Sequence, residues 1–217
     1  MCQALSVNAD ANELTTRFRI EKVVSHMSGL REVMPTEQLS IIFDDPYEGR
    51  LLGESRWGLM PFWAKDSILM ESRTMLWKPS FDRIIKKQRC IIPCHGFFVS
   101  RTEGKETQRA KLMMRSGSFA IAGLYDVFRS PSGGGETRTC TLITTQANAL
   151  VSPYQRQMPA ILEEEHVEAW LNGTFDDMFQ LHGMLRPMDP FQMVAASLLP
   201  VKGDKVPFEM PQPETAG

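Results

Sequence analysis

The feature that most constrains this fold is a succession of strand patterns between residues 89 and 145. Short runs rich in β-branched and aromatic residues alternate there with turn residues, and a Ser-Pro-Ser-Gly-Gly-Gly turn separates the last two, which predicts a hairpin. Helical patterns are few and short, and strand and helix do not alternate regularly, which argues against a doubly wound parallel sheet. We therefore expect a single α+β domain with a mixed, mostly antiparallel sheet, bifurcated or barrel-like, surrounded by short helices.

The individual elements follow from periodicity and from residues typical of caps and turns. Helices are expected over residues 10–18, 80–88, 163–171 and 174–182, with Ser80 as the cap of the second. Strands are expected over residues 39–43, 55–63, 89–93, 96–100, 110–115, 119–128, 137–145 and 192–201.

Length and composition limit the classes of protein to which the chain can belong. With 217 residues, 42% hydrophobic and 23% charged, the chain can build one substantial core, and we expect one domain over residues 1–217 with a frayed tail at 207–217. The net charge of −2 means that any binding of nucleic acid must depend on a local basic patch. Four cysteines are too few for a disulfide framework. Neither a signal peptide nor an apolar run of about 20 residues is present, so we expect a cytoplasmic protein with no membrane association.

Cys2 is the most informative single position. Removal of Met1 would leave a free α-amine beside a thiol, and this 1,2-aminothiol condenses with an aldehyde to an imine that the thiolate closes into a thiazolidine ring. The amine titrates near 8 and the thiol near 8.5, so both have reactive fractions at neutral pH. Taken alone, Cys2 is more readily explained as an incidental small residue after the start codon.

Six sequence blocks in a fixed order decide between these interpretations. The segment RWGLMPFWAKD at residues 56–66 closely resembles the RWGLIPxWAKD signature of the SOS-response-associated peptidase (SRAP) family. Five further blocks are similar to that family's conserved segments: VMPTEQ at 33–38, RCIIPCHGFF at 89–98, IAGLYD at 121–126, TLITTQAN at 141–148 and MPAIL at 158–162.

Members of this family process abasic sites in DNA and use the N-terminal cysteine to form a covalent cross-link. The resemblance implies that this chain captures the aldehyde of an abasic site, in single-stranded DNA, through Cys2, with possible lyase activity and N-terminal autoprocessing, and that it shields the lesion. It implies no cofactor and a monomer. Pro35 and Trp63 match family positions that wedge against or stack on bases, and Arg73 matches the arginine of the family's NAR motif.

The departures from the family pattern fall on groups that help the chemistry. Glu71 replaces the asparagine that contacts the sugar, and Val99 replaces a glutamate. The family's histidine position falls on Gln155, or on Tyr154 if one residue is inserted. Valine transfers no proton, and glutamine cannot exchange charge. Glu71 is the candidate replacement acid–base group, while His95 is either a second substitute or a neutral structural histidine.

Basic residues concentrate between positions 71 and 89, where Arg73, Lys78, Arg83, Lys86, Lys87 and Arg89 face only two acidic residues. Such a stripe predicts salt-dependent contacts to DNA phosphates, with Arg73, Lys78 and Arg83 as the leading candidates. A solvated helix face explains the same pattern equally well. Trp57 and Phe62 are expected in the core.

Other functions remain open from the sequence. The changed helper residues are compatible with a DNA-binding module of the same fold that has lost its chemistry. A thiol peptidase is also conceivable, although it needs a histidine near its cysteine, and the matching position is Gln155. Cys90, Cys94 and His95 have zinc-like spacing but no second ligand pair downstream, so no metal is expected.

Overall fold

The computed structural model of the chain describes residues 4–8, 10–26, 29–59, 68–75, 79–104, 106–129 and 136–198. Its strands are β1 (Ala4–Asn8), β2 (Lys22–Val23), β3 (Leu30–Val33), β4 (Gln38–Asp45), β5 (Gly49–Trp57), β6 (Leu69–Glu71), β7 (Arg89–Cys94), β8 (Gly96–Glu103), β9 (Glu106–Met114), β10 (Phe119–Arg129), β11 (Glu136–Gln146), β12 (Gln157–Pro159), β13 (Ile161–Leu162) and β14 (Met193–Leu198). Its helices are α1 (Ala11–Phe18), α2 (Ser72–Met75), α3 (Asp82–Lys87), α4 (Glu164–Leu171) and α5 (Met178–Gly183), with 3₁₀ turns η1 (Pro79–Phe81) and η2 (Pro190–Gln192).

The central feature of the fold is a barrel-like closure of the larger sheet. Strands β4, β5, β11, β10 and β7 pair in turn, and β7 returns to β4 through Ile42 and Ile91. The closing contact between β5 and β11 is parallel, whereas most other pairings are antiparallel. This arrangement confirms the expected α+β domain with a mixed, mostly antiparallel, barrel-like sheet.

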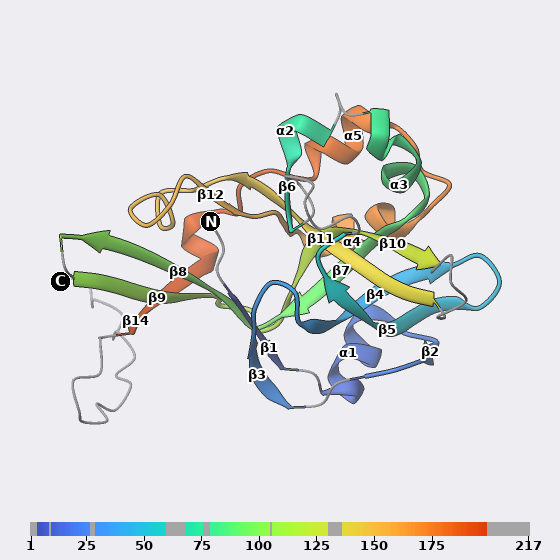
Figure 1. Ribbon diagram of the computed structural model, residues 1–217, viewed down its shortest axis with the longest axis horizontal. Coiled ribbons are helices and arrows are strands. Elements are labelled where there is room, and N and C mark those ends of the chain that lie inside the picture. Colours follow the sequence, from blue (N-terminus) through green and yellow to red (C-terminus); the bar gives the residue numbers. More distant parts are fainter. Residues whose placement is uncertain are drawn as a thin grey trace.

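A second sheet, in the order β14-β9-β8-β1-β3, extends from one end of the barrel. In Figure 1 its β8–β9 hairpin projects to the left, while α2, α3 and α5 lie above the barrel strands and α1 lies below them. Strands β1 and β3 were not expected from the sequence, because each is short and pairs with partners far along the chain. The chain enters this sheet at Ala4, directly opposite Phe98 of β8.

Alternation along the barrel strands builds two apolar clusters. Residues such as Ile41, Phe43 and Ile92 point into the first cluster, which continues onto the inner face of the five-stranded sheet. Their neighbours Ile42 and Ile91 point the other way, into a second cluster covered by helices α1, α3, α4 and α5. The short helices therefore cover the outside of the barrel, as the sequence predicted.

The expected hairpin is confirmed, since β10 and β11 pair antiparallel from Gly123–Leu142 to Arg129–Glu136. The strand expected over residues 55–63, with its later part running into an aromatic-proline turn, begins earlier than expected, because β5 spans Gly49–Trp57. Residues 60–63 lie outside the described residues. The chain turns after Trp57 because Gly58 adopts φ 136° and its N–H donates to the carbonyl of Cys140. Trp57 is fully buried, as expected, and its indole N–H donates to the carbonyl of Ile68 at 2.9 Å; Phe62 lies outside the described residues.

Helix boundaries follow the side chains that cap them. Asp10 caps α1 by accepting the N–H of Asn12, as its position before the apolar periodicity suggests. Ser80 does not cap a helix: it lies within a 3₁₀ turn, and α3 starts at Asp82 without a side-chain cap. Helix α5 starts at Met178 rather than Thr174. Asp177 caps it, because its side chain accepts the backbone N–H groups of Phe179 and Gln180.

Candidate functional site

Glu71 and Arg73 form an ion pair where β6 ends and α2 begins. Strand β6 runs parallel to β11, with Glu71 in register with Thr144. The Nε and Nη2 atoms of Arg73 lie 3.0 and 2.8 Å from the same carboxylate oxygen of Glu71. The Arg73 side chain is 76% exposed and that of Glu71 31% exposed, so a soluble ligand can reach the pair.

Thr144 of β11 lies between β6, which carries Glu71, and β12, which follows Gln155. The Thr144 hydroxyl lies 3.3 Å from the carbonyl oxygen of Met70 and 3.4 Å from Oε1 of Gln157, and can donate to either. The side-chain amide of Gln155 donates to the backbone carbonyl of Gln157 at 2.6 Å. The Thr144 hydroxyl thus contacts the backbone next to Glu71 on one side and Gln157, the partner of Gln155, on the other. We call Glu71, Arg73, Thr144, Gln155 and Gln157 the Glu71–Gln155 cluster.

The carbonyl oxygen of the Gln155 side chain is buried and has no hydrogen-bond partner among the described residues. An unsatisfied buried acceptor costs free energy unless it is needed for something else. Sequence reasoning missed Thr144 and Gln157 as members of this cluster. Both lie inside or directly beside the conserved blocks at 141–148 and 158–162, but only the pairing of β11 with β6 and β12 brings them together.

Asn148 holds the turn that presents Gln155. Its side-chain oxygen accepts the N–H groups of Leu150 and Val151 at 3.1 and 3.0 Å, and its amide donates to the carbonyl of Met188 at 2.7 Å. Val151 in turn accepts the backbone N–H of Gln155 at 3.2 Å. Asn148 is therefore a positioning residue, with its hydrogen-bonding groups occupied within the fold.

His95 lies in a different environment. Its backbone N–H donates to the carbonyl of Ser6 at 2.8 Å, and Nε2 lies 3.8 Å from a carboxylate oxygen of Glu13 on α1. Burial lowers the pKa of His95 below 6.5, against the opposing effect of Glu13 and with smaller lowering effects of Lys111 and Arg17. These contacts face α1, and none of them involves Glu71, Gln155 or Gln157 among the described residues.

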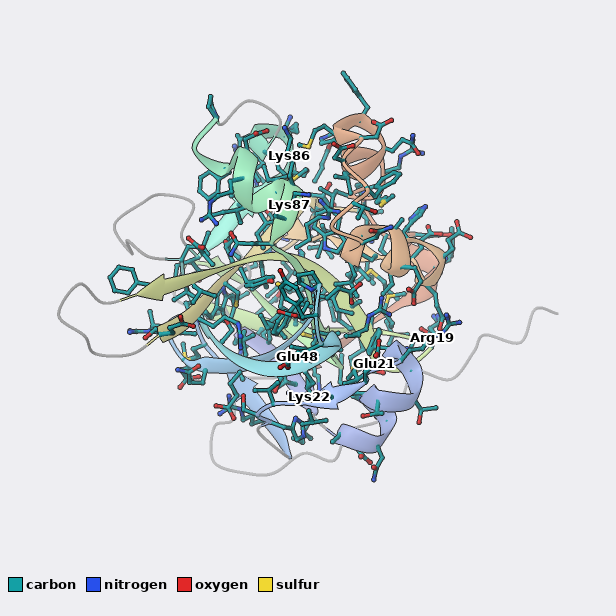
Figure 2. All side chains as sticks on the ribbon, turned by 90° about the vertical axis from the view of Figure 1, so that its right-hand side faces the viewer. Arg19, Glu21, Lys22, Glu48, Lys86 and Lys87 are labelled. Carbon is teal, nitrogen blue, oxygen red and sulfur yellow. The ribbon has the colours of Figure 1, made fainter. Side chains whose placement is uncertain are left out.

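The basic residues between positions 71 and 89 do not form one continuous stripe. Arg83 pairs with Asp126 at 3.0 Å and donates to Gln88 at 2.6 Å, and Lys86 pairs with Asp82 at 3.1 Å. Figure 2 shows Lys86 and Lys87 on helix α3, at the top of that view. Lys78 lies outside the described residues.

Arg89 departs furthest from the stripe, because its guanidinium is buried. It donates to the carbonyl oxygens of five residues in α3, at the end of α4 and in the segment that follows α4: Ile85, Lys86, Trp170, Asn172 and Phe175. Burial lowers the pKa of Arg89 to about 10. The expectation that Arg89 belongs to a phosphate-binding stripe is wrong, since it holds the helices together and cannot reach a ligand.

Pro35 occupies the turn between β3 and β4. Thr36 adopts φ 78°, an uncommon conformation for a β-branched residue, and its N–H donates to the carbonyl of Trp57 at 2.8 Å. The carboxylate of Glu37 accepts the N–H of Met34 at 2.7 Å. Pro35 is thus presented by a turn that hydrogen bonds fix against the end of β5; Trp63, expected to act with it, lies outside the described residues.

Val99, at the position of the family's glutamate, is fully buried in the first apolar cluster. Strand β8 carries it next to Phe98, the partner of Ala4. Cys2 lies outside the described residues, two positions before Ala4 in the sequence. Cys90, Cys94 and Cys140 are buried and form no disulfide among the described residues. Burial raises the pKa of Cys90 and raises that of Cys140 to about 12, so these two thiols are poor nucleophiles.

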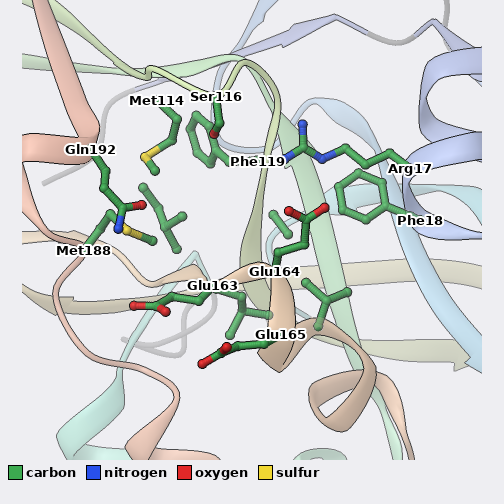
Figure 3. Close-up of a pocket in the computed structure, with 14 residues that line it drawn as sticks. Arg17, Phe18, Met114, Ser116, Phe119, Glu163, Glu164, Glu165, Met188 and Gln192 are labelled. Carbon is green, nitrogen blue, oxygen red and sulfur yellow. The ribbon is translucent and has the colours of Figure 1, made fainter.

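A cavity of about 300 Å³ lies between α1, the start of β10, α4 and η2. Figure 3 shows Arg17 facing Glu164 across its mouth, with Met114 and Met188 on the other side. The cavity does not include any member of the Glu71–Gln155 cluster. Within the described part of the chain there is no group of side chains suited to a metal ion, nor a helix long and apolar enough to cross a membrane.

Comparison with known proteins gives one consistent result. A family model described as SOS response associated peptidase (SRAP) matches residues 1–202. The abasic site processing protein YoqW of Bacillus subtilis (strain 168) is 33% identical over 207 residues, covering 90% of this chain and 91% of the relative. The abasic site processing protein HMCES of Gallus gallus is 28% identical over 201 residues, covering 76% of this chain and 60% of the relative. An X-ray structure of a protein from Bacteroides thetaiotaomicron superposes with a TM-score of 0.79 and 28% identity, covering 91% of this chain and 92% of that one.

Proposed function

Because the chain belongs to the SOS response associated peptidase (SRAP) family, we propose that it processes abasic sites in DNA by covalent capture through Cys2. The named relatives are abasic site processing proteins, and the chain carries the aminothiol residue that this chemistry needs. The observation that carries the proposal in the structure is the Glu71–Gln155 cluster, which combines an ionisable carboxylate with an exposed arginine.

The reaction is condensation of a DNA aldehyde with the N-terminal residue. After loss of Met1, the α-amine of Cys2 adds to the C1′ aldehyde of the opened abasic sugar and releases water to form an imine. The Cys2 thiolate then adds to the imine carbon, and the nitrogen takes up a proton, which closes a thiazolidine ring. The intermediate imine also permits β-elimination of the 3′ phosphate, which is the origin of the possible lyase activity.

Ring opening of the sugar requires proton transfer, because the abasic deoxyribose exists mostly as a closed hemiacetal. Within the Glu71–Gln155 cluster, Glu71 is the carboxylate available for this step, since Gln155 and Gln157 can only donate or accept hydrogen bonds. We assign Glu71 the acid–base role and Gln155 the role of orienting the sugar. Val99 is eliminated as an acid–base group, because a buried aliphatic side chain transfers no proton. This leaves Glu71 as the candidate.

DNA binding is assigned to Arg73, whose exposed guanidinium suits a phosphate, and to Pro35 on its fixed turn. Trp63, Lys78 and Arg83 remain sequence-based candidates. A preference for single-stranded DNA fits candidates such as Pro35 and Trp63, because rings of this kind contact unpaired bases more readily than a closed duplex.

The decisive experiment is intact-mass analysis before and after incubation with an oligonucleotide that carries one abasic site. We expect the mature chain to lack Met1 and to gain the mass of the oligonucleotide minus one water. Cys2→Ala should remove the stable adduct, whereas Cys2→Ser should leave only an imine that borohydride traps. A matched oligonucleotide with an intact base is the control and should give no adduct.

One alternative has its own observation in favour. Gln155 and Val99 cannot transfer protons, so the chain would also suit a module that binds abasic DNA without reacting. Binding of the abasic oligonucleotide with no adduct after long incubation would establish this alternative and overturn covalent capture. Retention of Met1 in most molecules would also overturn covalent capture, because an extended amine cannot form the ring.

A further inference from the structure

Glu71 occupies the edge of Arg73 that a phosphate would use. Both Nε and Nη2 of Arg73 point at one oxygen of the Glu71 carboxylate, at 3.0 and 2.8 Å. This pair of donors is the fork with which arginine binds carboxylates and phosphates. Since these two donors already point at the carboxylate, a phosphate that binds the same edge of Arg73 must replace the carboxylate.

We propose that Glu71 is a built-in competitor for the DNA phosphate, which Arg73 exchanges for the carboxylate when DNA binds. This inference rests on the proposed function and adds to it a control step at the same site. The exchange releases the Glu71 carboxylate from its ion pair at the moment when the sugar arrives. Binding of the DNA backbone and availability of the acid–base group are thereby coupled.

The geometry of the cluster favours exchange over a permanent ion pair. Arg73 is 76% exposed and Glu71 31% exposed, and ion pairs at such positions are weak because water screens them. Glu71 is attached to a paired strand, opposite Thr144, whereas Arg73 belongs to the short helix α2. Because strand pairing holds the backbone of Glu71 and the Arg73 guanidinium is exposed, the arginine can turn toward a phosphate without disturbing the sheet.

The competing carboxylate is a departure of this chain from the family motif. The family motif has an asparagine at the position of Glu71, and a neutral amide neither neutralises an arginine nor repels a phosphate. The carboxylate therefore lowers affinity for any DNA backbone, and the released group is the one that the abasic sugar needs. The structure assigns to Glu71 two linked effects, on binding and on reaction.

The test is a double-mutant cycle on binding of single-stranded DNA that carries a tetrahydrofuran abasic analogue, which has no aldehyde and cannot react. Dissociation constants are measured by fluorescence anisotropy for the parent, Glu71→Gln, Arg73→Gln and the double variant. Glu71→Gln should tighten binding about three- to tenfold, as expected for removal of a weak ion pair that competes for the Arg73 guanidinium. In the Arg73→Gln background the same substitution should change binding by less than about twofold, because the arginine through which Glu71 acts is gone.

Glu48→Gln is the matched control. Glu48 pairs with Lys22 at 2.7 Å, with 49% and 54% of their side chains exposed, and the pair lies at β2 and the β4–β5 turn, away from α2 (Figures 1 and 2). This variant loses the same charge from the same residue type and should leave affinity within about twofold of the parent.

If Glu71→Gln tightens binding equally with and without Arg73, the effect is one of net charge and the exchange is overturned. The same holds if Glu48→Gln tightens binding as much as Glu71→Gln does. No change or weaker binding in Glu71→Gln would overturn the exchange as well. If the parent does not bind the DNA at all, the proposed function itself fails. A parent that binds, with no coupling in the cycle, contradicts only the competitor. Thermal melting of each variant verifies that all four remain folded.

Discussion

Arg73 and Arg89 belong to the same basic segment, yet the fold uses them in opposite ways. Arg89 is 3% exposed and surrounded by backbone carbonyls from two helical regions, whereas the Arg73 side chain is 76% exposed and bonded to one carboxylate. A buried arginine with many acceptors stabilises the fold, and an exposed arginine with one exchangeable partner can serve a ligand. The comparison shows that clustered charge in a sequence does not establish a binding surface.

The largest expected effect is loss of stability on removing the buried arginine. Arg89→Ala leaves the carbonyls of residues such as Ile85 and Trp170 without their donor, and should lower the free energy of unfolding by about 3–5 kcal/mol. Urea denaturation measures this loss. Arg83→Ala, which removes an exposed arginine from the same segment, should cost less than about 1 kcal/mol, and equal costs would remove the distinction drawn here.

A charge placed where the fold offers it no partner sharpens the same comparison. Val99 is fully buried among apolar side chains, so Val99→Glu should lower the free energy of unfolding by about 2–4 kcal/mol at pH 7. Because burial raises the pKa of a carboxyl in the folded state, that state binds more protons, and stability should fall as pH rises from 5 to 7. Val99→Gln should lack this pH dependence. A glutamate that costs nothing would mean that the site holds an acid–base partner.

The exposed arginine should affect binding rather than stability. Arg73→Gln should weaken binding of single-stranded abasic-analogue DNA about fivefold at 0.1 M salt and reduce the salt slope by about 0.7, the value of one phosphate contact. Anisotropy titrations at several salt concentrations measure both quantities. Lys22→Gln removes an equivalent charge from β2 and should leave the slope unchanged; a loss as large as that of Arg73→Gln would mean that only net charge matters.

The smallest expected effect concerns His95, a half-buried imidazole that lies near Glu13 of α1. Its folded-state pKa lies below 6.5 because burial disfavours the imidazolium. The unfolded state therefore binds more protons below pH 6.5, and stability should fall as pH drops from 6.5 toward the folded-state pKa. Urea midpoints at pH 7.5 and 5.5 should differ less in His95→Gln than in the parent. An unchanged difference would assign the pH dependence to other groups.

The sequence by itself determined the family and much of the framework. Motifs between residues 33 and 162 identified the SRAP family, which the family match over residues 1–202 confirms. The β10–β11 hairpin and helices α1 and α4 were also predictable, since hairpins, caps and amphipathic periodicity depend on residues close together in the chain. Cys2 as the reactive residue remains a prediction from sequence and family.

Only the tertiary structure decided which polar residues act together. The parallel pairing of β6 with β11 brings Glu71 opposite Thr144, and the antiparallel pairing of β12 places Gln157 on the other side. No local pattern encodes these contacts, because β6 and β12 have only three residues each. The two residues that the Thr144 hydroxyl contacts lie 74 and 13 positions away in the sequence. Burial likewise made Arg89 structural and left Arg73 exposed. An arginine's partners and solvation depend on the packing around it, and packing is settled only when distant segments meet.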